Sequence, residues 1–239
     1  MKKYSRQIIV GDIHGCIDEF EELIRALKYN KKYDRLILLG DLVDRGPNSL
    51  AVVQKARKMD LECVMGNHEH KFLKWWKSSG TRADVYDRSD YYSKLTEEDV
   101  NYIFQMPTYI KLEDNIVVVH AGVKPGISIS NQSKDDLMHL RYVDSQQKFI
   151  SLKKIAKNGK EAMGAHFWTE FWRGPESIIY GHNVHSTTDP LIEEVSPGVM
   201  CYGLDTGCCF GGRLSAMILE TKEIIQVQAK KTYYQKFEI

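Results

Sequence analysis

The chain has 239 residues, of which 43% are apolar and 27% are charged, and its formal net charge is +1. This composition is that of a globular protein with a sizeable core, and it excludes disordered and low-complexity chains. The near-neutral charge gives no global attraction to nucleic acid or to an anionic membrane, so any anion must be recognised by a local site. No apolar run approaches the length that spans a bilayer, and the N-terminal residues do not resemble a signal peptide. The five cysteines, an odd number without a C-x-x-C spacing, favour reduced thiols and a cytoplasmic location.

The first third of the sequence alternates short apolar runs with amphipathic segments. We expect strands at 8–10, 36–39 and 63–65, each ended by a glycine. A helix follows each strand. The first carries Phe20, Leu23, Ile24 and Leu27 on one face, the second runs from Asn48 to about Met59, and the third carries Phe72 and Leu73. This β-α-β-α-β order predicts a parallel sheet with helices on its faces.

The rest of the sequence predicts a second group of strands. Residues 78–95 are polar and irregular, and a capping box at Thr96 opens a short helix that stops before Pro107. A hairpin is expected at 109–119, and short strands at 178–180, 199–204, 214–219 and 224–227, the last two antiparallel. The stretch 128–176 has weak apolar periodicity. We therefore predict one α/β domain over residues 1–239, with two sheets and a cap or loop region at about 123–176.

Polar side chains follow five of the predicted strands. The segments are Gly-Asp-Ile-His-Gly at 11–15, Gly-Asp-Leu-Val-Asp-Arg-Gly at 40–46, Gly-Asn-His-Glu at 66–69, His-Ala-Gly at 120–122 and Gly-His at 181–182. In open α/β sheets, ligands bind beyond the carboxyl ends of the strands. The sequence therefore predicts that these Asp, Asn and His side chains converge on one edge.

The residue types in these segments suit a pair of metal ions. Imidazole, carboxylate and amide ligands favour manganese, iron, zinc or cobalt over calcium. One carboxylate can bridge two ions that lie about 3.5–4 Å apart. An arginine fork matches phosphate oxygens, and Arg45 lies four residues after Asp41, within reach of the same pocket.

In order, G-D-x-H-G, G-D-x-V-D-R-G, G-N-H-E, H-A-G and G-H resemble the pattern of the calcineurin-like metallophosphoesterases. The sequence is most similar to their phosphoprotein-phosphatase branch, that of the bacterial serine/threonine phosphatases. The resemblance runs from about Ile8 to Leu219. It implies a four-layer αββα sandwich that binds two divalent metal ions, with manganese expected and iron, zinc or cobalt as alternatives.

The resemblance also implies a role for each matching residue. The first metal ion would be held by Asp12, His14 and Asp41, and the second by Asp41, Asn67, His120 and His182, with Asp41 bridging. His68 would protonate the leaving oxygen as general acid, and Asp44 would orient and charge it. Arg45 would bind the phosphoryl oxygens, and Arg141 is the best match for a second phosphate-binding arginine.

Two substrate classes fit a metal-activated hydroxide that attacks a phosphoryl group. The main interpretation is hydrolysis of phosphoserine or phosphothreonine in proteins, because Asp44 and Glu69 match the protein-phosphatase branch. The alternative is symmetrical hydrolysis of dinucleoside tetraphosphates. Residues 136–141 and 204–214 are closer to those ApaH-like relatives. At the positions of Asp44 and Glu69, however, these relatives tend to have a neutral residue and Asp, respectively.

Three further features remain open at this point. A non-catalytic binding module is the third hypothesis, but no metal ligand, general acid or motif arginine is missing. His185 is either a substrate-side residue or a loop histidine, and the basic run 153–160 is either a solvated face or a surface that attracts a phosphorylated partner. No basic stripe or aromatic platform indicates nucleic-acid binding, and no motif specifies an oligomeric state.

Overall fold

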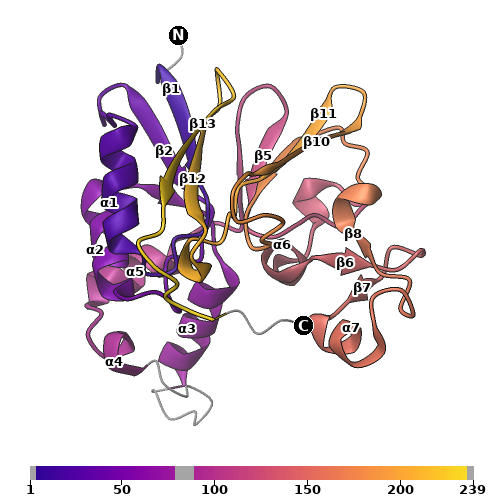
Figure 1. The fold of residues 1–239 in the computed structure, drawn as a ribbon, viewed down its shortest axis with the longest axis horizontal. Coiled ribbons are helices and arrows are strands. Elements are labelled where there is room, and N and C mark those ends of the chain that lie inside the picture. Colours follow the sequence, from indigo (N-terminus) through magenta and orange to yellow (C-terminus); the bar gives the residue numbers. More distant parts are fainter. Residues whose placement is uncertain (1–3, 79–88, 236–239) are drawn as a thin grey trace.

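A computed structural model of the chain describes residues 4–78 and 89–235. Two five-stranded sheets stand face to face in the middle of the molecule (Figure 1). The first has the order β13 (Glu223–Gln228), β12 (Arg213–Ile218), β1 (Arg6–Val10), β2 (Asp34–Leu38) and β3 (Glu62–Cys63). Strands β1, β2 and β3 are parallel, as predicted, and β12 is antiparallel to both of its neighbours.

The second sheet carries the predicted hairpin at one edge. Its order is β10 (Leu191–Ser196), β11 (Val199–Gly203), β9 (Ser177–Tyr180), β5 (Ile116–Val119) and β4 (Tyr109–Lys111). The three central strands, β11, β9 and β5, are parallel, and the edge strands β10 and β4 are antiparallel to their neighbours. Both sheets therefore direct the carboxyl ends of parallel strands toward one end of the molecule.

Helices cover the outer face of each sheet (Figure 1). The first sheet is covered by α1 (Ile17–Ala26), α2 (Ser49–Met59), α3 (Asn67–Lys77), α4 (Ser89–Tyr92) and α5 (Glu97–Phe104). The second is covered by α6 (Lys134–His139), the 3₁₀ helices η1 (Ile129–Asn131) and η2 (Trp168–Glu170), and a small sheet of β7 (Phe149–Ile150), β6 (Tyr142–Val143) and β8 (His166–Phe167). Helix α7 (Leu152–Asn158) follows β7 and has no buried residue. A third 3₁₀ helix, η3 (Cys208–Phe210), precedes β12. The arrangement confirms the four-layer αββα sandwich.

The inner strands contain uninterrupted apolar runs, such as 8–10 in β1 and 116–119 in β5, because both faces of each sheet are buried there. Within β1, Ile9 packs between the two sheets, whereas Val10 packs under the helices of the first sheet. Within β5, Val118 faces the other sheet and Val119 packs against the outer layer of the second sheet. Adjacent residues of a strand point to opposite faces, so a run without alternation fills two cores at once.

Two strands of the fold differ from the sequence prediction. Strand β3 covers only Glu62–Cys63 instead of 63–65, because the Met65 amide turns away to donate to the Pro107 carbonyl (2.7 Å). Strand β10 was not predicted. The stretch 128–176, predicted as a cap or loop region, contains α6, α7 and the small sheet. Of the irregular segment predicted at 78–95, residues 79–88 lie outside the described part of the chain.

In the described part of the chain, no helix has the length and apolar character that crossing a membrane requires.

Candidate active site

The five predicted motifs converge where parallel strands of both sheets end. Strands β1, β2 and β3 deliver the residues of the first three motifs, and β5 and β9 deliver His120 and His182 from the facing sheet. The converging side chains are almost completely buried, apart from a half-buried Asn67: Asp12, His14, Asp41, His68, His120 and His182 are each at most 8% exposed. The structure thus brings together all the residues that were predicted, from the motifs, to be metal ligands.

His120 is the centre of one group of ligand atoms. Its Nδ1 donates to the Leu39 carbonyl (2.6 Å), which leaves Nε2 as the ring nitrogen that could bind a metal ion. That nitrogen lies 3.0 Å from Asn67 Oδ1, 3.1 Å from His182 Nδ1 and 3.4 Å from Asp41 Oδ1. Four potential ligand atoms therefore face one another.

A second group lies on the other side of Asp41. The Nδ1 of His14 donates to the Val43 carbonyl (2.8 Å), which leaves Nε2 directed at Asp41 Oδ2 (3.5 Å). His68 Nε2 lies 3.8 Å from the same oxygen. Asp41 thus has one carboxylate oxygen beside each group, as a bridging ligand requires.

Asp12 lies at the junction of the two sheets. Its carboxylate accepts the His182 amide N–H at 3.1 Å and 3.0 Å. Burial and the neighbouring Asp205 raise the pKa of Asp12 well above its ordinary value, and Asp41 raises it further. A bound cation would relieve this repulsion between buried carboxylates.

The donor set fits divalent metal ions. Although burial lowers the pKa of His120, the Asp41 carboxylate raises it to about 9, so a positive charge is favoured at the point where the lone pairs meet. Imidazole nitrogens and carboxylate oxygens within 4.8 Å of one another, buried and facing inward, are the ligands that manganese, iron, zinc or cobalt would take. Asp41, His120 and His182 could hold one ion, and His14 with Asp41 another.

Backbone strain is concentrated in this site. His14, Asp41 and His182 have φ values of 47°, 48° and 66°, and Asp44 and Arg45 have 70° and 66°. Residues other than glycine seldom adopt this left-handed conformation, which costs about 1–3 kcal/mol each and persists where the surroundings impose it. The strained backbone points the side chains into the site, and four of the five residues are Asp or His, which adopt this conformation more often than other non-glycine residues.

Two motif glycines are required by close approach. A Cβ at Gly66 would lie 2.3 Å from Asp41 Oδ1, and a Cβ at Gly181 would lie 2.0 Å from Asp12 Oδ1. Both values are below any real contact of a Cβ atom. These glycines let the two carboxylates lie against the backbone of a neighbouring strand end.

Glu69 ties the second and third motifs together, a role that the sequence analysis missed. Its fully buried carboxylate accepts the amide N–H groups of Asp41 (2.8 Å), Leu42 (2.8 Å), Val43 (3.2 Å) and Gly66 (3.2 Å). Burial and Asp41 raise the pKa of Glu69 to about 7. Its place as the last residue of Gly-Asn-His-Glu was the only signal in the sequence.

His68 and Asp44 form a hydrogen-bonded pair, as the motifs predicted. His68 Nδ1 and Asp44 Oδ2 are 2.5 Å apart, so the Nε2 edge of the ring faces the site. The Tyr91 hydroxyl donates to the other oxygen of Asp44 (2.5 Å), and the Ser49 hydroxyl accepts the Asp44 amide N–H (2.9 Å). Tyr91 on α4 was not expected, because no motif surrounds it.

The two predicted arginines lie in the same pocket. Burial lowers the pKa of Arg141, and the positive charge of Arg45 lowers it further. Arg141 Nη2 donates to the His182 carbonyl (2.7 Å), and Arg45 Nη1 donates to His14 Nε2 (2.6 Å). Asp205, which follows β11 as Asp12 follows β1, is a buried carboxylate beside both guanidinium groups, and sequence reasoning missed it. Two cations this close favour an anion between them.

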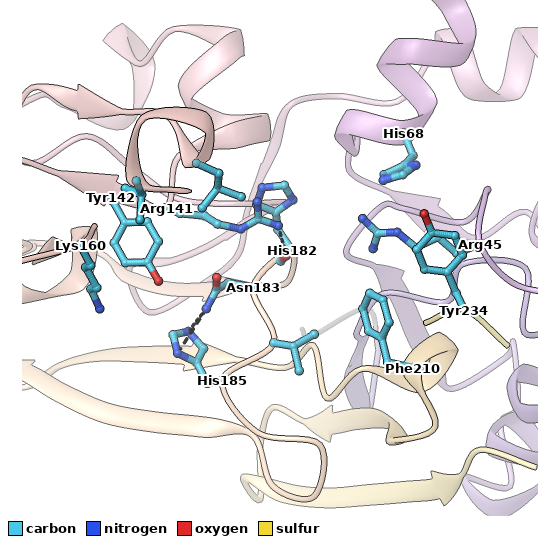
Figure 2. A pocket seen from close by; sticks show the side chains of 13 residues that line it. Arg45, His68, Arg141, Tyr142, Lys160, His182, Asn183, His185, Phe210 and Tyr234 are labelled. Carbon is cyan, nitrogen blue, oxygen red and sulfur yellow. Dashed lines mark hydrogen bonds between the residues drawn. The ribbon is translucent and has the colours of Figure 1, made fainter. Parts of the chain in front are cut away.

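A cavity of about 740 Å³ opens beside the site. Figure 2 shows His68, Arg45, Phe210 and Tyr234 on one side, and Tyr142, Lys160 and His185 on the other, with Arg141 and His182 between them. Its lining is Arg45, His68, Arg141, Tyr142, Leu152, Ile155, Lys160, His182, Asn183, Val184, His185, Phe210 and Tyr234. His185, left open by the sequence, is therefore a cavity residue, whereas of the lysines in the basic run only Lys160 lines the cavity.

The chain belongs to the calcineurin-like phosphoesterase family, whose family model matches residues 5–215. It is thus a metallophosphoesterase, a hydrolase of phosphoester or phosphoanhydride bonds, and the family implies two divalent metal ions.

Its curated relatives fall into two groups by name. The chain is 27% identical to an asymmetrical bis(5'-nucleosyl)-tetraphosphatase PrpE of Oceanobacillus iheyensis, over 94% of this chain and 93% of the relative. It is 28% identical to a symmetrical bis(5'-nucleosyl)-tetraphosphatase of Baumannia cicadellinicola, over 93% and 92%. It is also 28% identical to serine/threonine-protein phosphatase 1 of Salmonella typhimurium, over 90% and 92%.

A solved structure of similar fold is also described as a tetraphosphatase. The crystal structure of a putative diadenosine tetraphosphatase superposes with a TM-score of 0.77 at 30% identity, covering 94% of this chain and 93% of the other.

Proposed function

We propose that this protein hydrolyses dinucleoside tetraphosphates with two divalent metal ions. The observation that carries the proposal is the cavity: about 740 Å³, with Arg45 and Arg141 converging at the metal ligands and a third cation, Lys160, at the opposite wall. A single phosphate group would leave most of this space empty, whereas a polyphosphate with its nucleosides matches the size of ordinary ligand pockets. The names of the relatives and of the solved structure support the same substrate class.

In this proposal the chain's own residues bind and orient the phosphates. Asp12, His14 and Asp41 would hold the first ion, and Asp41, Asn67, His120 and His182 the second. The chemistry that the ions supply when bound is neutralisation of phosphoryl charge and activation of the attacking water. Arg45 and Arg141 would bind the phosphoryl oxygens in both ground and transition states.

His68 would supply the proton that the leaving oxygen takes up. Its Nδ1 is held by Asp44 (2.5 Å), so Nε2 is the atom that faces the reacting group. Tyr91 fixes the far oxygen of Asp44 and thereby the ring. A phosphate leaving group needs less help from an acid than an alkoxide does.

The test compares two substrates on one preparation. Manganese-loaded protein should hydrolyse diadenosine tetraphosphate with a higher kcat/KM than a phosphoserine peptide. Chromatography of the products identifies the bond that breaks: two ADP indicate symmetrical cleavage, and AMP with ATP indicates asymmetrical cleavage. Rapid release of phosphate from the peptide, with the tetraphosphate barely touched, would overturn the proposal.

Phosphoprotein hydrolysis, the main interpretation of the sequence, is the second candidate. The observation that favours it is the complete His68–Asp44 pair, because a serine alkoxide is a poor leaving group that needs a proton. The relative in Salmonella typhimurium carries that activity in its name. The same two-substrate comparison separates the candidates.

A further inference from the structure

Helix α7 presents its apolar side chains to the cavity. Leu152 and Ile155 are three residues apart, so they share one face of the helix, and both line the cavity. α7 has no fully buried residue, and neither side chain belongs to a hydrophobic cluster of the described residues. A surface helix ordinarily packs its apolar stripe on the core. Here the stripe faces an open space beside the candidate metal site.

Aromatic and polar groups complete this side of the cavity. The Lys160 ammonium lies 4.8 Å from the centre of the Tyr142 ring. The Asn183 amide nitrogen lies 3.3 Å and 3.1 Å from the two ring nitrogens of His185. Figure 2 shows these four side chains on the same side of the cavity, across from Arg45 and Phe210. A concave apolar surface with a few hydrogen-bonding groups is typical of a small-molecule site.

The position of this surface relative to the charges identifies its occupant. Arg141 lies between it and His182, so an anion bound by the arginines would have its next groups beside Tyr142 and Lys160. A ligand that is anionic at one end and flat and weakly polar at the other matches this sequence of surfaces. A nucleoside polyphosphate has that form, whereas the backbone of a phosphopeptide would bring amide groups against the apolar face of α7 without hydrogen-bond partners.

We propose that Tyr142, Leu152, Ile155, Asn183 and His185 form a nucleoside wall that binds the base and ribose of a nucleoside polyphosphate. Lys160 neutralises the phosphates next to that nucleoside. The inference rests on the proposed function for its substrate class. It also gives a role to His185 and to Lys160 at the end of the basic run, which the metal site does not use.

The experiment measures the contribution of the nucleoside alone. ADP and inorganic pyrophosphate are compared as inhibitors of p-nitrophenyl phosphate hydrolysis by the manganese-loaded protein, with manganese in excess. Because contact of a base with aromatic and apolar side chains adds affinity, ADP should inhibit at about tenfold lower concentration than pyrophosphate. In the double variant Leu152→Ala/Ile155→Ala, the ratio of the inhibitory concentration of pyrophosphate to that of ADP should fall to about two. Alanine keeps the helix but removes its apolar face.

Two further variants provide a second test and a control. Tyr142→Leu should reduce the same ratio, so the test does not depend on α7 alone. Ile192→Ala, which removes an exposed apolar side chain from β10, should leave the ratio as in the unaltered protein. Equal inhibition by ADP and pyrophosphate in the unaltered protein would overturn the nucleoside wall. An unchanged ratio in the α7 variant, including the case in which both inhibitors weaken equally, would also overturn it.

The two proposals can fail separately. If the ratio falls as expected but only phosphopeptides are hydrolysed, the nucleoside wall stands and the proposed function is wrong. If diadenosine tetraphosphate is hydrolysed but the α7 variant keeps its ratio, the function stands and the nucleoside wall is wrong.

Discussion

The two sides of the cavity are built in different ways. On the strand-end side, the candidate metal ligands are nearly all buried, and imidazoles such as His14 and His120 use one nitrogen to bind a backbone carbonyl. Five residues there are held in a left-handed backbone conformation. The nucleoside wall has half-buried side chains and one exposed side chain, His185, on a two-residue strand, a seven-residue helix and a loop.

The difference separates chemistry from recognition. A rigid, over-determined group keeps reacting atoms in place, and small displacements there are costly. A wall of partly exposed side chains contributes area and can vary with less effect on the fold. We therefore expect substitutions on the strand-end side to act mainly on turnover, and substitutions on the nucleoside wall to act on affinity for the nucleoside.

Asp41→Asn should have the largest effect. Asparagine keeps the shape and tolerates the left-handed φ of 48°, but it removes the negative charge shared by both groups of ligand atoms. We expect loss of bound metal and a fall in activity of at least about 10⁴-fold, since several kcal/mol of charge stabilisation disappear. Elemental analysis and hydrolysis of p-nitrophenyl phosphate measure both.

Asp60→Asn is the matched control, because Asp60 also has a left-handed φ, of 59°, and its side chain is 87% exposed. It should retain metal and activity. Near-normal metal content and activity in Asp41→Asn would show that the bridging role is wrong.

His68→Asn should separate catalysis from metal binding. The variant should keep its metal and lose about a hundredfold or more in kcat, within the usual range for a general acid. The loss in kcat should be smaller for p-nitrophenyl phosphate than for a substrate with a poorer leaving group, because the nitrophenolate needs little protonation. His70→Asn, two residues further along α3, serves as control and should keep its activity within about twofold. Metal loss in His68→Asn would instead make this residue a ligand.

Arg141→Gln tests the residue that joins the two sides. Its guanidinium donates to the His182 carbonyl and lies in the cavity beside Arg45. Loss of a charged hydrogen-bond donor should lower kcat/KM for diadenosine tetraphosphate by about ten- to a hundredfold. Arg173→Gln is the control, because Arg173 also donates to backbone carbonyls but does not line the cavity. Unchanged kinetics, with unchanged inhibition by phosphate, would reduce Arg141 to a structural residue.

Tyr91→Phe should have the smallest effect on the strand-end side. It removes one hydrogen bond to Asp44, which acts only through His68. We expect kcat to fall about two- to fivefold with little change in KM, as the loss of one hydrogen bond implies. The fall should be larger for an alkyl phosphate than for p-nitrophenyl phosphate, a dependence that a general loss of stability would not produce. Tyr102→Phe, whose hydroxyl donates to the Leu61 carbonyl, controls for that loss.

The sequence predicted the strand-end side well because its signals are local. Each strand and its polar segment are adjacent in the chain, and parallel strands bring such segments to one edge. Asn48 and Thr96 likewise cap α2 and α5, through their own neighbours three residues on. The resemblance located Arg141, which no periodicity indicated.

The residues and strands that the sequence missed have no clear local signal. Tyr91 and Asp44 are 47 positions apart, and no pattern links them. Strand β10 contains Glu193 and Glu194 and lies at a sheet edge, where charged residues are tolerated and obscure the strand signal. The two-residue strands β6, β7 and β8 are too short for any periodicity to show.

Tyr234, near the end of the described residues that follow β13, is part of the cavity lining. Glu19 on α1 accepts the Lys230 amide (2.9 Å) and the Tyr233 hydroxyl (2.7 Å), and the Cys209 carbonyl accepts the Tyr234 amide (2.9 Å). Tyr234 is thereby placed against the ring of Phe210, 6.2 Å between centres, at the cavity wall. For protein engineering, this makes the two ends of the chain unequal. An affinity tag belongs before β1, whose first residue is at the far end of that strand from Asp12, whereas a fusion directly after Tyr234 would begin beside the cavity.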